Sequence, residues 1–377
     1  MRVTIKDIAE RAGVSKTAVS FAFNDPSRLA KQTRERIRAI AAEFGYSPDP
    51  VARTLTTKRS GSIGFLLPQG IPVAFKNPFL SQVIRGLGQV CQHEGLSLTI
   101  VPPLKGCIFR AIRSAAVDGF VTLGLETDMK AVSLLQQRHI PFVTIDGGPS
   151  DDVASVNTDD RIGAYRIMGH ILHLEHRRIG ILSLEAAKKI DHAGFSLVRD
   201  KRLEGYTQAL EEVGMSLQDP RVQVVHCECS LEGGRKAARS LLSQPVPPTA
   251  IVAMSDIIAL GAHRFCGDRG IQIPYQVSLA GYDDIPESAL VSPALSTVSQ
   301  QGVEKGKQAG SHPGCGENMR LRNPPIVIQS SIIGTNQCGG PPGRRLPRWE
   351  RCLWRGTSMR RNPSLDLSSS VVPLDGC

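Results

Sequence analysis

Three short amphipathic segments separated by turn residues fill the first 45 residues, and this spacing restricts the fold more than any other feature of the chain. Apolar residues recur at helical spacing in residues 4–12, 16–23 and 32–44. Gly13 supplies a tight turn after the first segment, and Gly45 ends the third. Helices this short can bury a common core only by packing together, so the spacing predicts a three-helix unit with a helix-turn-helix. The exposed face of its second helix is then free to enter the major groove of DNA.

Polar residues at the starts of these segments match helix caps. Thr4 and Asp7 form a capping-box-like start, and Ser15 can cap the second helix. The periodicity places a set of apolar side chains in the shared core: Ile5, Ile8, Ala9, Ala12, Val19, Ala22, Phe23, Ile37, Ile40, Ala41 and Phe44.

The charge distribution fits a nucleic-acid-binding head on a neutral body. Residues 1–60 carry 12 Lys and Arg against 6 Asp and Glu, and residues 339–377 carry 7 against 3. The remaining residues carry 26 of each. A basic end is the electrostatic footprint of DNA binding, although an ordinary solvated surface would also account for it.

Several protein classes find no support in the sequence. No apolar run approaches the eighteen residues of a membrane span, and charges interrupt the N-terminal stretch where a secretory signal would need apolar residues, so a cytoplasmic protein is expected. There is no dinucleotide fingerprint, phosphate-binding loop or nucleophile elbow, so we expect no enzyme, no catalytic residue and no cofactor. Reduced thiols are expected at nine cysteines without metal-site spacing: 91, 107, 227, 229, 266, 315, 338, 352 and 377.

From residue 62 onward, apolar runs alternate with helix-like stretches. Repeating βα units predict an α/β fold of parallel sheets, and two sets of strands predict two similar subdomains with a ligand cleft at the carboxyl ends of the strands. Strands are expected at Ile63–Leu67, Ser97–Val101, Gly119–Leu123, Phe142–Ile145, Ile179–Leu182, Val222–Val225, Ala250–Ala253 and Val277–Ala280. Helices are expected at about 79–94, 128–138, 159–174, 200–213, 232–243 and 256–268.

The N-terminal pattern resembles a known family over residues 4–55, TIKDIAERAGVSKTAVSFAFNDPSRLAKQTRERIRAIAAEFGYSPDPVARTL. It is similar to the headpiece and hinge of the LacI family of bacterial repressors. The resemblance implies a DNA-binding headpiece at 1–48 and a hinge helix with linker at 49–61. It also implies base contacts from Lys16, Thr17 and Phe21, and phosphate contacts from Thr4, Ser15, Ser20, Asn24 and Thr33.

Two positions in this region carry specific expectations. Phe21 stands where the family usually has Arg; it can touch a thymine methyl but cannot hydrogen-bond guanine, and it can alternatively turn into the small core. Leu55 matches the minor-groove wedge of the hinge, although an ordinary linker would also contain such a residue. A hinge this short is expected to fold only when two copies meet on DNA.

The body of the chain is similar to the sensor core of the same family, which has the type 1 periplasmic-binding-protein-like fold. The marker segments are PFVTIDG (141–147), HRRIGIL (176–182), RLEGYTQAL (202–210), SDIIALGA (255–262), LAGYDDI (279–285) and LSTVSQ (295–300). The resemblance implies an effector and dimerisation core at 62–338. It places the following residues in the effector cleft: Asp146, Arg202, Ser255, Asp283 and Gln300.

These side chains suit a sugar or sugar derivative, because carboxylates accept from hydroxyls and Arg donates. An alternative is that Asp146 and the pair Asp283-Asp284 are strand-end turn residues that bind their own backbone. Ser255 stands where Asn is common, and Cys229 lies near a usual aromatic position, so the identity of the effector stays open.

Two further features have a less specific meaning. His170, His173 and His176 invite a metal hypothesis, but no carboxylate completes a site, so solvent-facing residues at a helix end are expected and no metal. After residue 307 the pattern fails, because the residues at 310–316 cannot continue a helix. PPIVIQSSIIGTNQ (324–337) resembles the final strand of the family. Residues 339–377 predict a disordered tail or, together with 308–322, the product of a shifted reading frame.

The sequence therefore predicts a transcription regulator, a repressor that binds a pseudo-palindromic operator as a homodimer and responds to a small-molecule effector, with a carbohydrate as the expected ligand. The alternative is the solute-binding protein of a transport system, which the core alone would allow.

Overall fold

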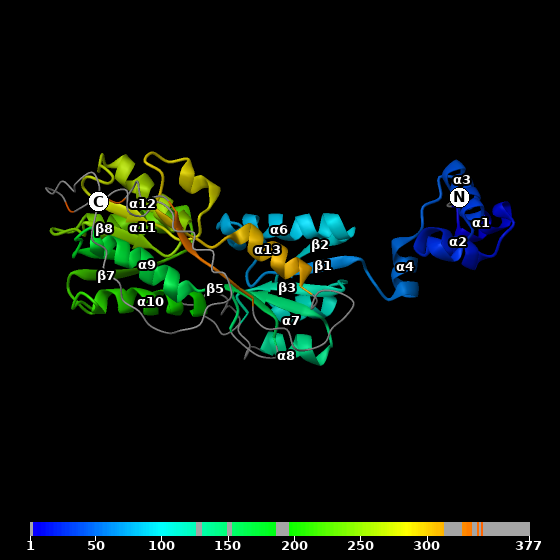
Figure 1. Ribbon diagram of the computed structural model, residues 1–377, viewed down its shortest axis with the longest axis horizontal. Coiled ribbons are helices and arrows are strands. Elements are labelled where there is room, and N and C mark those ends of the chain that lie inside the picture. The colour runs from blue at the N-terminus through cyan, green and yellow to red at the C-terminus, as the bar shows by residue number, and fades with distance from the viewer. Residues whose placement is uncertain are drawn as a thin grey trace, which may run out of the picture.

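The computed structural model describes residues 3–125, 130–148, 153–185, 196–312 and 326–333, together with residues 338 and 341. A small headpiece lies at one end and is joined through a short helix to a longer body made of two subdomains (Figure 1). Residues 313–325 lie outside the described part, and so does the expected tail at 339–377 apart from residue 341, so the expectations for these segments stay untested.

The headpiece contains the three predicted helices, α1 (Ile5–Ala12), α2 (Lys16–Asn24) and α3 (Lys31–Glu43), with a 3₁₀ turn η1 (Pro26–Arg28). Their shared core contains Ile8, Val19, Ala22 and Ile37, each at most 1% exposed. The predicted caps are confirmed: the backbone N–H of Thr4 donates to Asp7 Oδ2 at 2.8 Å, and Ser15 Oγ accepts from the N–H of Ala18 at 3.1 Å.

The prediction that Phe44 lies in the core of the headpiece is wrong. Phe44 is 37% exposed. Helix α3 ends at Glu43, so Phe44 is its C-cap and its side chain leaves the buried face of the helix. The Arg11 guanidinium lies 5.2 Å from the centre of the Phe44 ring and covers part of it.

Helix α4 (Pro50–Thr57) occupies the predicted hinge. It is helical in this single chain, and the expectation that it folds only when two copies meet on DNA stays a prediction. The linker that follows is fastened to the body by one carboxylate. Asp118 accepts from the backbone N–H and hydroxyl of Ser60, at 2.6 and 2.9 Å, and from the N–H of Gly61 at 2.8 Å.

The N-terminal subdomain is built on a parallel sheet, which in the described part of the chain has the strand order β11-β5-β4-β3-β1-β2. Its strands are β1 (Ser62–Leu66), β2 (Ser97–Val101), β3 (Gly119–Leu123), β4 (Phe142–Ile145), β5 (Ser155–Thr158) and β11 (Ile326–Ile328). Its helices are α5 (Ile71–Ala74), α6 (Phe79–Glu94), α7 (Ile108–Ser114), α8 (Lys130–Gln137) and α13 (Gly302–Ser311). The central strands β1 and β3 are buried along their whole length because helices cover both faces.

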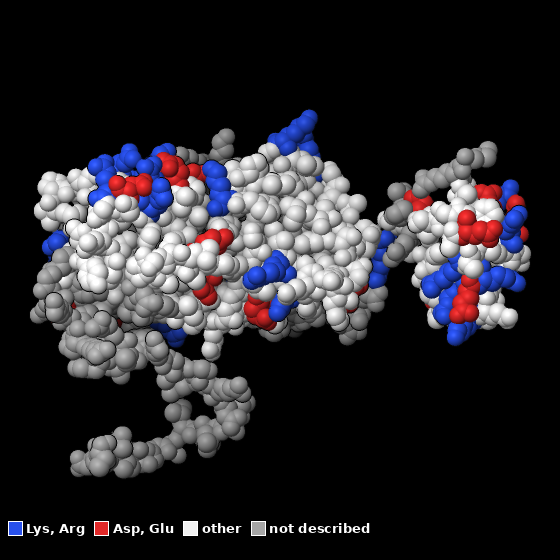
Figure 2. Space-filling view, turned by 90° about the horizontal axis from the view of Figure 1, so that it is seen from above, with Lys and Arg blue, Asp and Glu red and all other residues white. Residues whose placement is uncertain are grey.

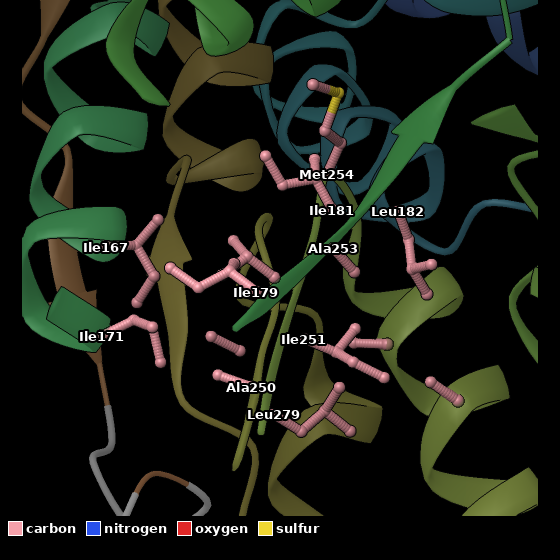
Figure 3. Packing of buried hydrophobic residues seen from close by; sticks show 14 of the residues in the cluster. Ile167, Ile171, Ile179, Ile181, Leu182, Ala250, Ile251, Ala253, Met254 and Leu279 are labelled. Carbon is pink, nitrogen blue, oxygen red and sulfur yellow. The ribbon is translucent and has the colours of Figure 1, made fainter. Parts of the chain in front are cut away.

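The C-terminal subdomain repeats this plan with the order β7-β6-β8-β9 among the strands that the structure describes. Its strands are β6 (Ile179–Leu184), β7 (Val222–Cys227), β8 (Ala250–Ala253) and β9 (Ser278–Ala280). Its helices are α9 (Asp160–His173), α10 (Ser196–Glu211), α11 (Leu231–Leu242) and α12 (Asp256–Asp268), with a 3₁₀ turn η3 (Pro286–Ala289). Figure 3 shows Ile167 and Ile171 of α9 directed at the sheet beside Ile179 of β6.

The chain passes between the subdomains at three places in the described residues. It crosses from β5 to α9, back from β10 (Thr297–Ser299) to α13, and again from β11 to β12 (Ser331–Ile333). Strands β10 and β12 pair antiparallel beside α9. The single final strand predicted at 324–337 is therefore wrong: its two halves belong to different sheets, because the chain changes subdomain between them.

The predicted environment of the histidines is also wrong in part. His170 and His176 are buried, and only His173 is exposed. The two ring nitrogens of His176 face Thr249 Oγ1 at 2.9 Å and Ser278 Oγ at 3.0 Å, so this histidine joins the turn between α9 and β6 to the segments at β8 and β9. No group of three potential metal ligands occurs among the described residues.

Candidate functional site

The headpiece presents the residues expected at DNA on its accessible surface. Exposed side chains are Thr4, Ser15, Lys16, Thr17, Asn24 and Leu55, and half-buried ones are Ser20, Phe21 and Thr33. None of these side chains is needed for the buried core of the headpiece, so they are available to a partner. Figure 2 shows basic side chains gathered on the visible face of the headpiece, with acidic ones among them.

Phe21 does not turn into the described core of the headpiece, where Phe23 packs instead. The Arg28 guanidinium lies 5.1 Å from the centre of the Phe21 ring, and its Nε lies 2.7 Å from Asp25 Oδ2. The Arg28 cation thus lies over the Phe21 ring on α2. This arrangement favours the outward position of Phe21 over the inward one.

The five residues expected at the effector cleft converge on one cavity between the subdomains. Asp146 follows β4 of the N-terminal subdomain. The others come from the C-terminal side: Arg202 from α10, Ser255 from the N-cap of α12, Asp283 from the end of β9, and Gln300 from the end of β10. Parallel strands bring their carboxyl ends to one edge, which is why residues so distant in sequence meet there.

Asp283 is the centre of the polar network in this cavity. Its carboxylate accepts from Ser255 Oγ at 2.5 Å and from Gln300 Nε2 at 2.5 Å. It is 2% exposed, and burial raises the pKa of its carboxyl to about 6, although Arg202, Ser255 and Gln300 oppose the rise. The carboxylate binds side chains from other segments. This geometry favours a cleft residue over a turn residue that binds its own backbone.

The backbone at these acidic positions is unusual. Asp146, Asp283 and Asp284 have φ angles of 54, 132 and 60°. Non-glycine residues with positive φ cost about 1–3 kcal/mol where the conformation is strained, and they are concentrated at binding sites. The surrounding strands and hydrogen bonds hold these turns in place.

Arg202 lines the cavity and is bound by three groups of the protein. Its Nε donates to Asp160 Oδ1 at 2.8 Å, its Nη1 donates to the carbonyl oxygen of Met254, and its guanidinium lies 3.6 Å from the centre of the Tyr282 ring. Burial alone would lower the pKa of Arg202, but Asp160, Tyr282 and Asp283 raise it above its usual value. It stays charged.

Two residues of the site were missed at the sequence level. Lys305 of α13 is fully buried; its Nζ lies 2.5 Å from Asp146 Oδ1 and 2.8 Å from Gln300 Oε1. Asp256, the first residue of α12, accepts from the hydroxyls of Ser288 and Thr297 at 2.7 and 2.6 Å. A lysine in the first turns of a helix usually reaches solvent, so nothing in the local pattern marks Lys305 as buried.

Asp256 and Asp283 are two buried acids, of which Asp283 lines the cavity and Asp256 does not. Burial, followed by the charge of Asp283, raises the pKa of Asp256 to about 7. Two carboxyls in one buried site cannot both ionise freely.

Apart from Asn77 and Gly124, the rest of the cavity wall is apolar. It includes Phe79, Leu123, Leu184, Val198 and Met254, together with the thiol of Cys229, whose pKa burial raises to about 12. The cavity measures about 30 Å³, which is room for about one or two water molecules. A hydroxylated ligand could donate to the carboxylates and lie against the apolar wall, but the subdomains would have to move apart to admit it.

Comparisons with known proteins agree with this architecture. A family profile described as "Bacterial regulatory proteins, lacI family" matches residues 4–49, and one described as "Periplasmic binding protein-like domain" matches residues 168–312. The chain is similar to an HTH-type transcriptional regulator of Mycobacterium tuberculosis, at 32% identity over 364 residues, which are 90% of this chain and 98% of the relative.

Two solved structures share the fold. A lac repressor dimer bound to operator and the anti-inducer ONPF matches with a TM-score of 0.74 at 22% identity, covering 90% of this chain and 100% of that chain. The complex of the transcriptional regulator CelR with cellobiose matches with a TM-score of 0.63 at 23% identity, covering 89% and 100%. Within the described residues no helix is both long and apolar enough to cross a membrane.

Proposed function

The chain belongs to the LacI family of bacterial transcription regulators, and from that premise we propose that it is a repressor whose hold on an operator is set by a small molecule in the inter-subdomain cleft. The observation that carries the proposal is the convergence of five polar side chains on one cleft, in the same chain as an exposed helix-turn-helix. A solute-binding protein would need the cleft but not the headpiece, which is why the regulator is favoured over the transport alternative.

For DNA binding, the proposal assigns residues 1–48 to the headpiece. Lys16, Thr17 and Phe21 on the accessible face of α2 contact base edges and thereby specify sequence. The phosphate contacts that position the protein come from Thr4, Ser15, Ser20, Asn24 and Thr33. Two copies bind a pseudo-palindrome, as the dimeric relative bound to operator suggests.

Residues 49–61 are proposed to form the hinge. Leu55 is 77% exposed on α4, so its side chain is available to enter the minor groove between the half-sites. The proposal places the protein in the cytoplasm, where the DNA is, and assigns it no catalytic activity.

For effector binding, the proposal assigns residues 62–338 to the sensor core. Asp146, Asp283 and Gln300 would accept from or donate to the hydroxyls of a carbohydrate. Ser255 holds the Asp283 carboxylate, and Arg202, held by Asp160, adds donors to the same cleft. The CelR–cellobiose complex shows that a protein of this fold takes a sugar. Effector binding and operator binding weaken or strengthen each other by the same factor, since coupling between two sites is reciprocal.

The test is a selection of bound sequences from a random duplex pool with the full-length protein at two salt concentrations. A pseudo-palindrome should be enriched, and its affinity should fall steeply as salt rises, because each phosphate contact releases counterions. Lys16→Ala should reduce the affinity at least tenfold and relax one position of each half-site. Lys236→Ala removes an equal charge from the exposed face of α11 and should have no such effect.

Weak, salt-sensitive binding without any enriched sequence would contradict the proposal. If an operator is enriched, it serves as the probe for screening sugars. A sugar that lowers the affinity for this operator is an inducer, and one that raises it is a corepressor.

A further inference from the structure

Lys305 occupies a position from which its charge cannot reach solvent. Helix α13 packs directly on α6, and a Cβ atom on Gly306 would run into the carbonyl oxygen of Val83. This close backbone contact fixes the first turns of α13 against the N-terminal subdomain. The Lys305 side chain is 0% exposed, so its ammonium must find its partners inside the protein.

The partners of Lys305 link the two walls of the cleft. Its Nζ donates to Asp146 Oδ1 and to Gln300 Oε1, at 2.5 and 2.8 Å, and it lies 5.4 Å from the centre of the Phe79 ring. An ammonium group can only donate, so the oxygen of the Gln300 amide must face Lys305. The NH₂ of that amide then points at Asp283, where Nε2 lies 2.5 Å from Oδ1.

Buried carboxyl groups outnumber buried cations around the cavity. Four buried carboxyls, those of Asp146, Asp160, Asp256 and Asp283, face two cations, Arg202 and Lys305. Both cations are already engaged: Arg202 with Asp160, and Lys305 with Asp146. A phosphate or carboxylate entering the cavity would meet cations whose charge these carboxylates already balance, whereas a hydroxyl can donate to lone pairs that the carboxylates still have.

We propose that Lys305 is a positioning residue that determines ligand charge in this cleft: it neutralises Asp146 and orients Gln300, so the cleft takes an uncharged, hydroxyl-rich ligand and rejects anionic ones. This inference rests on the effector site proposed above. It assigns the ammonium a role opposite to that of an anion anchor, which an isolated buried lysine would otherwise suggest.

The first test uses matched probes on the full-length protein: ribose and ribose 5-phosphate, glucose and glucose 6-phosphate, and inorganic phosphate alone. Isothermal titration calorimetry should give each phosphorylated probe a dissociation constant at least tenfold higher than that of its neutral counterpart, or no binding at all. If a phosphorylated probe binds more tightly than its counterpart, and Lys305→Met abolishes that binding, Lys305 is an anion anchor and the inference is wrong.

The second test needs no ligand. Burial raises the pKa of Asp146 and the Lys305 ammonium opposes that rise, while Asp160 and Arg202 also face the carboxyl and are unchanged by the substitution. In Lys305→Met the pKa of Asp146 rises further. The folding equilibrium constant of the variant, relative to the wild type, should fall by up to tenfold per pH unit as pH rises above the pKa that Asp146 has in the folded wild type.

The double variant Asp146→Asn/Lys305→Met removes both charges and should restore the pH profile of the wild type in chemical unfolding experiments. This variant also keeps the inference testable if Lys305→Met alone does not fold. A double variant no better than Lys305→Met, or a single variant with an unchanged pH profile, would show that Lys305 does not balance Asp146. Neither result depends on operator selection, so failure of the proposed function can be recognised separately.

Discussion

Arg202 illustrates how the cleft converts burial into order. A guanidinium has its N–H donors in a fixed plane; here Nε donates to a carboxylate, Nη1 donates to a backbone carbonyl, and the guanidinium carbon lies over an aromatic ring. The three partners come from different places in the fold: the first residue of α9, the residue after β8 and the segment after β9. One buried, charged side chain therefore connects α9 with the segments that follow β8 and β9.

Replacing Arg202 should expose how much depends on this side chain. Arg202→Met leaves Asp160 buried without its partner, so the free energy of unfolding should fall by about 3–5 kcal/mol. Arg221→Met is the matched control, since Arg221 pairs with Asp219 at the surface and such pairs contribute little. Urea unfolding measures both, and equal losses in the two variants would refute the role assigned to Arg202.

His170 gives the protein an acid-sensitive position outside the cleft. Burial, and then the nearby His173 and His176, lower its pKa from 6.5 to about 4. The unfolded chain therefore takes up a proton that the folded chain resists, and stability is lost as pH falls from about 6.5 to 4. The buried carboxyls Asp256 and Asp283 have raised pKa values and act oppositely, losing stability as pH rises from about 4 to 7.

The contribution of His170 can be isolated by substitution. His170→Gln should remove an acid-dependent loss on the order of 2–3 kcal/mol between pH 6.5 and 4, seen as a flatter dependence of unfolding free energy on pH. His226→Gln, an exposed position on β7 whose side chain does not act on His170, should keep the profile of the wild type. Identical profiles for all three proteins would contradict the assignment.

At the scale of elements, the packing of α13 on α6 decides where Lys305 lies in the cleft. The two helices touch at Gly86 and Gly306, where any side chain would meet backbone atoms of the partner helix. This contact sets the position of Lys305 relative to Asp146. Helix α13 ends at Ser311, as expected from the residues at 310–316, which cannot continue a helix.

Two alanine substitutions on α6 test this contact. Gly86→Ala places a methyl group against the carbonyl oxygen of Val303 and should reduce the free energy of unfolding by about 1–3 kcal/mol. Gly88→Ala, two residues along, meets open space and should stabilise the helix by about 0.5–1 kcal/mol. Chemical denaturation distinguishes the two, and a neutral Gly86→Ala would mean that the helices are not in backbone contact.

At the scale of the whole molecule, the headpiece and the body have separate hydrophobic cores that communicate through one linker. Asp118 at the start of β3 holds that linker by three hydrogen bonds. A movement of the N-terminal subdomain is therefore passed to α4 through a fixed point. Any coupling between cleft and DNA has to travel along this connection or through contacts between two copies.

Asp118→Ala should accordingly weaken coupling more than binding. The ratio of operator affinities with and without the effector should fall severalfold toward one, while effector affinity in the absence of DNA stays unchanged. Fluorescence anisotropy with the selected operator measures the ratio. Asp219→Ala, a surface substitution in the other subdomain, serves as the control and should preserve it.

The sequence by itself determined the architecture. Helix spacing and caps predicted α1 to α3, and the alternation of apolar runs placed eight strands within two residues of their observed ends. These elements are local in origin, because the period of 3.6 or the apolar run is set by neighbouring residues. The resemblance of the marker segments to a family was enough to group Asp146, Arg202, Ser255, Asp283 and Gln300 in one cleft, where the folded chain brings them together.

Only the tertiary structure decided what those residues do to one another. Strands β5, β10 and β12 are short and polar or cross between subdomains, so their pairing depends on partners far along the chain. The burial of Lys305 and His170 is equally non-local, because neighbouring elements rather than adjacent residues exclude water from a side chain. For the same reason the sequence could name the polar groups of the cleft, while the distances in the folded chain alone reveal which charges are already paired.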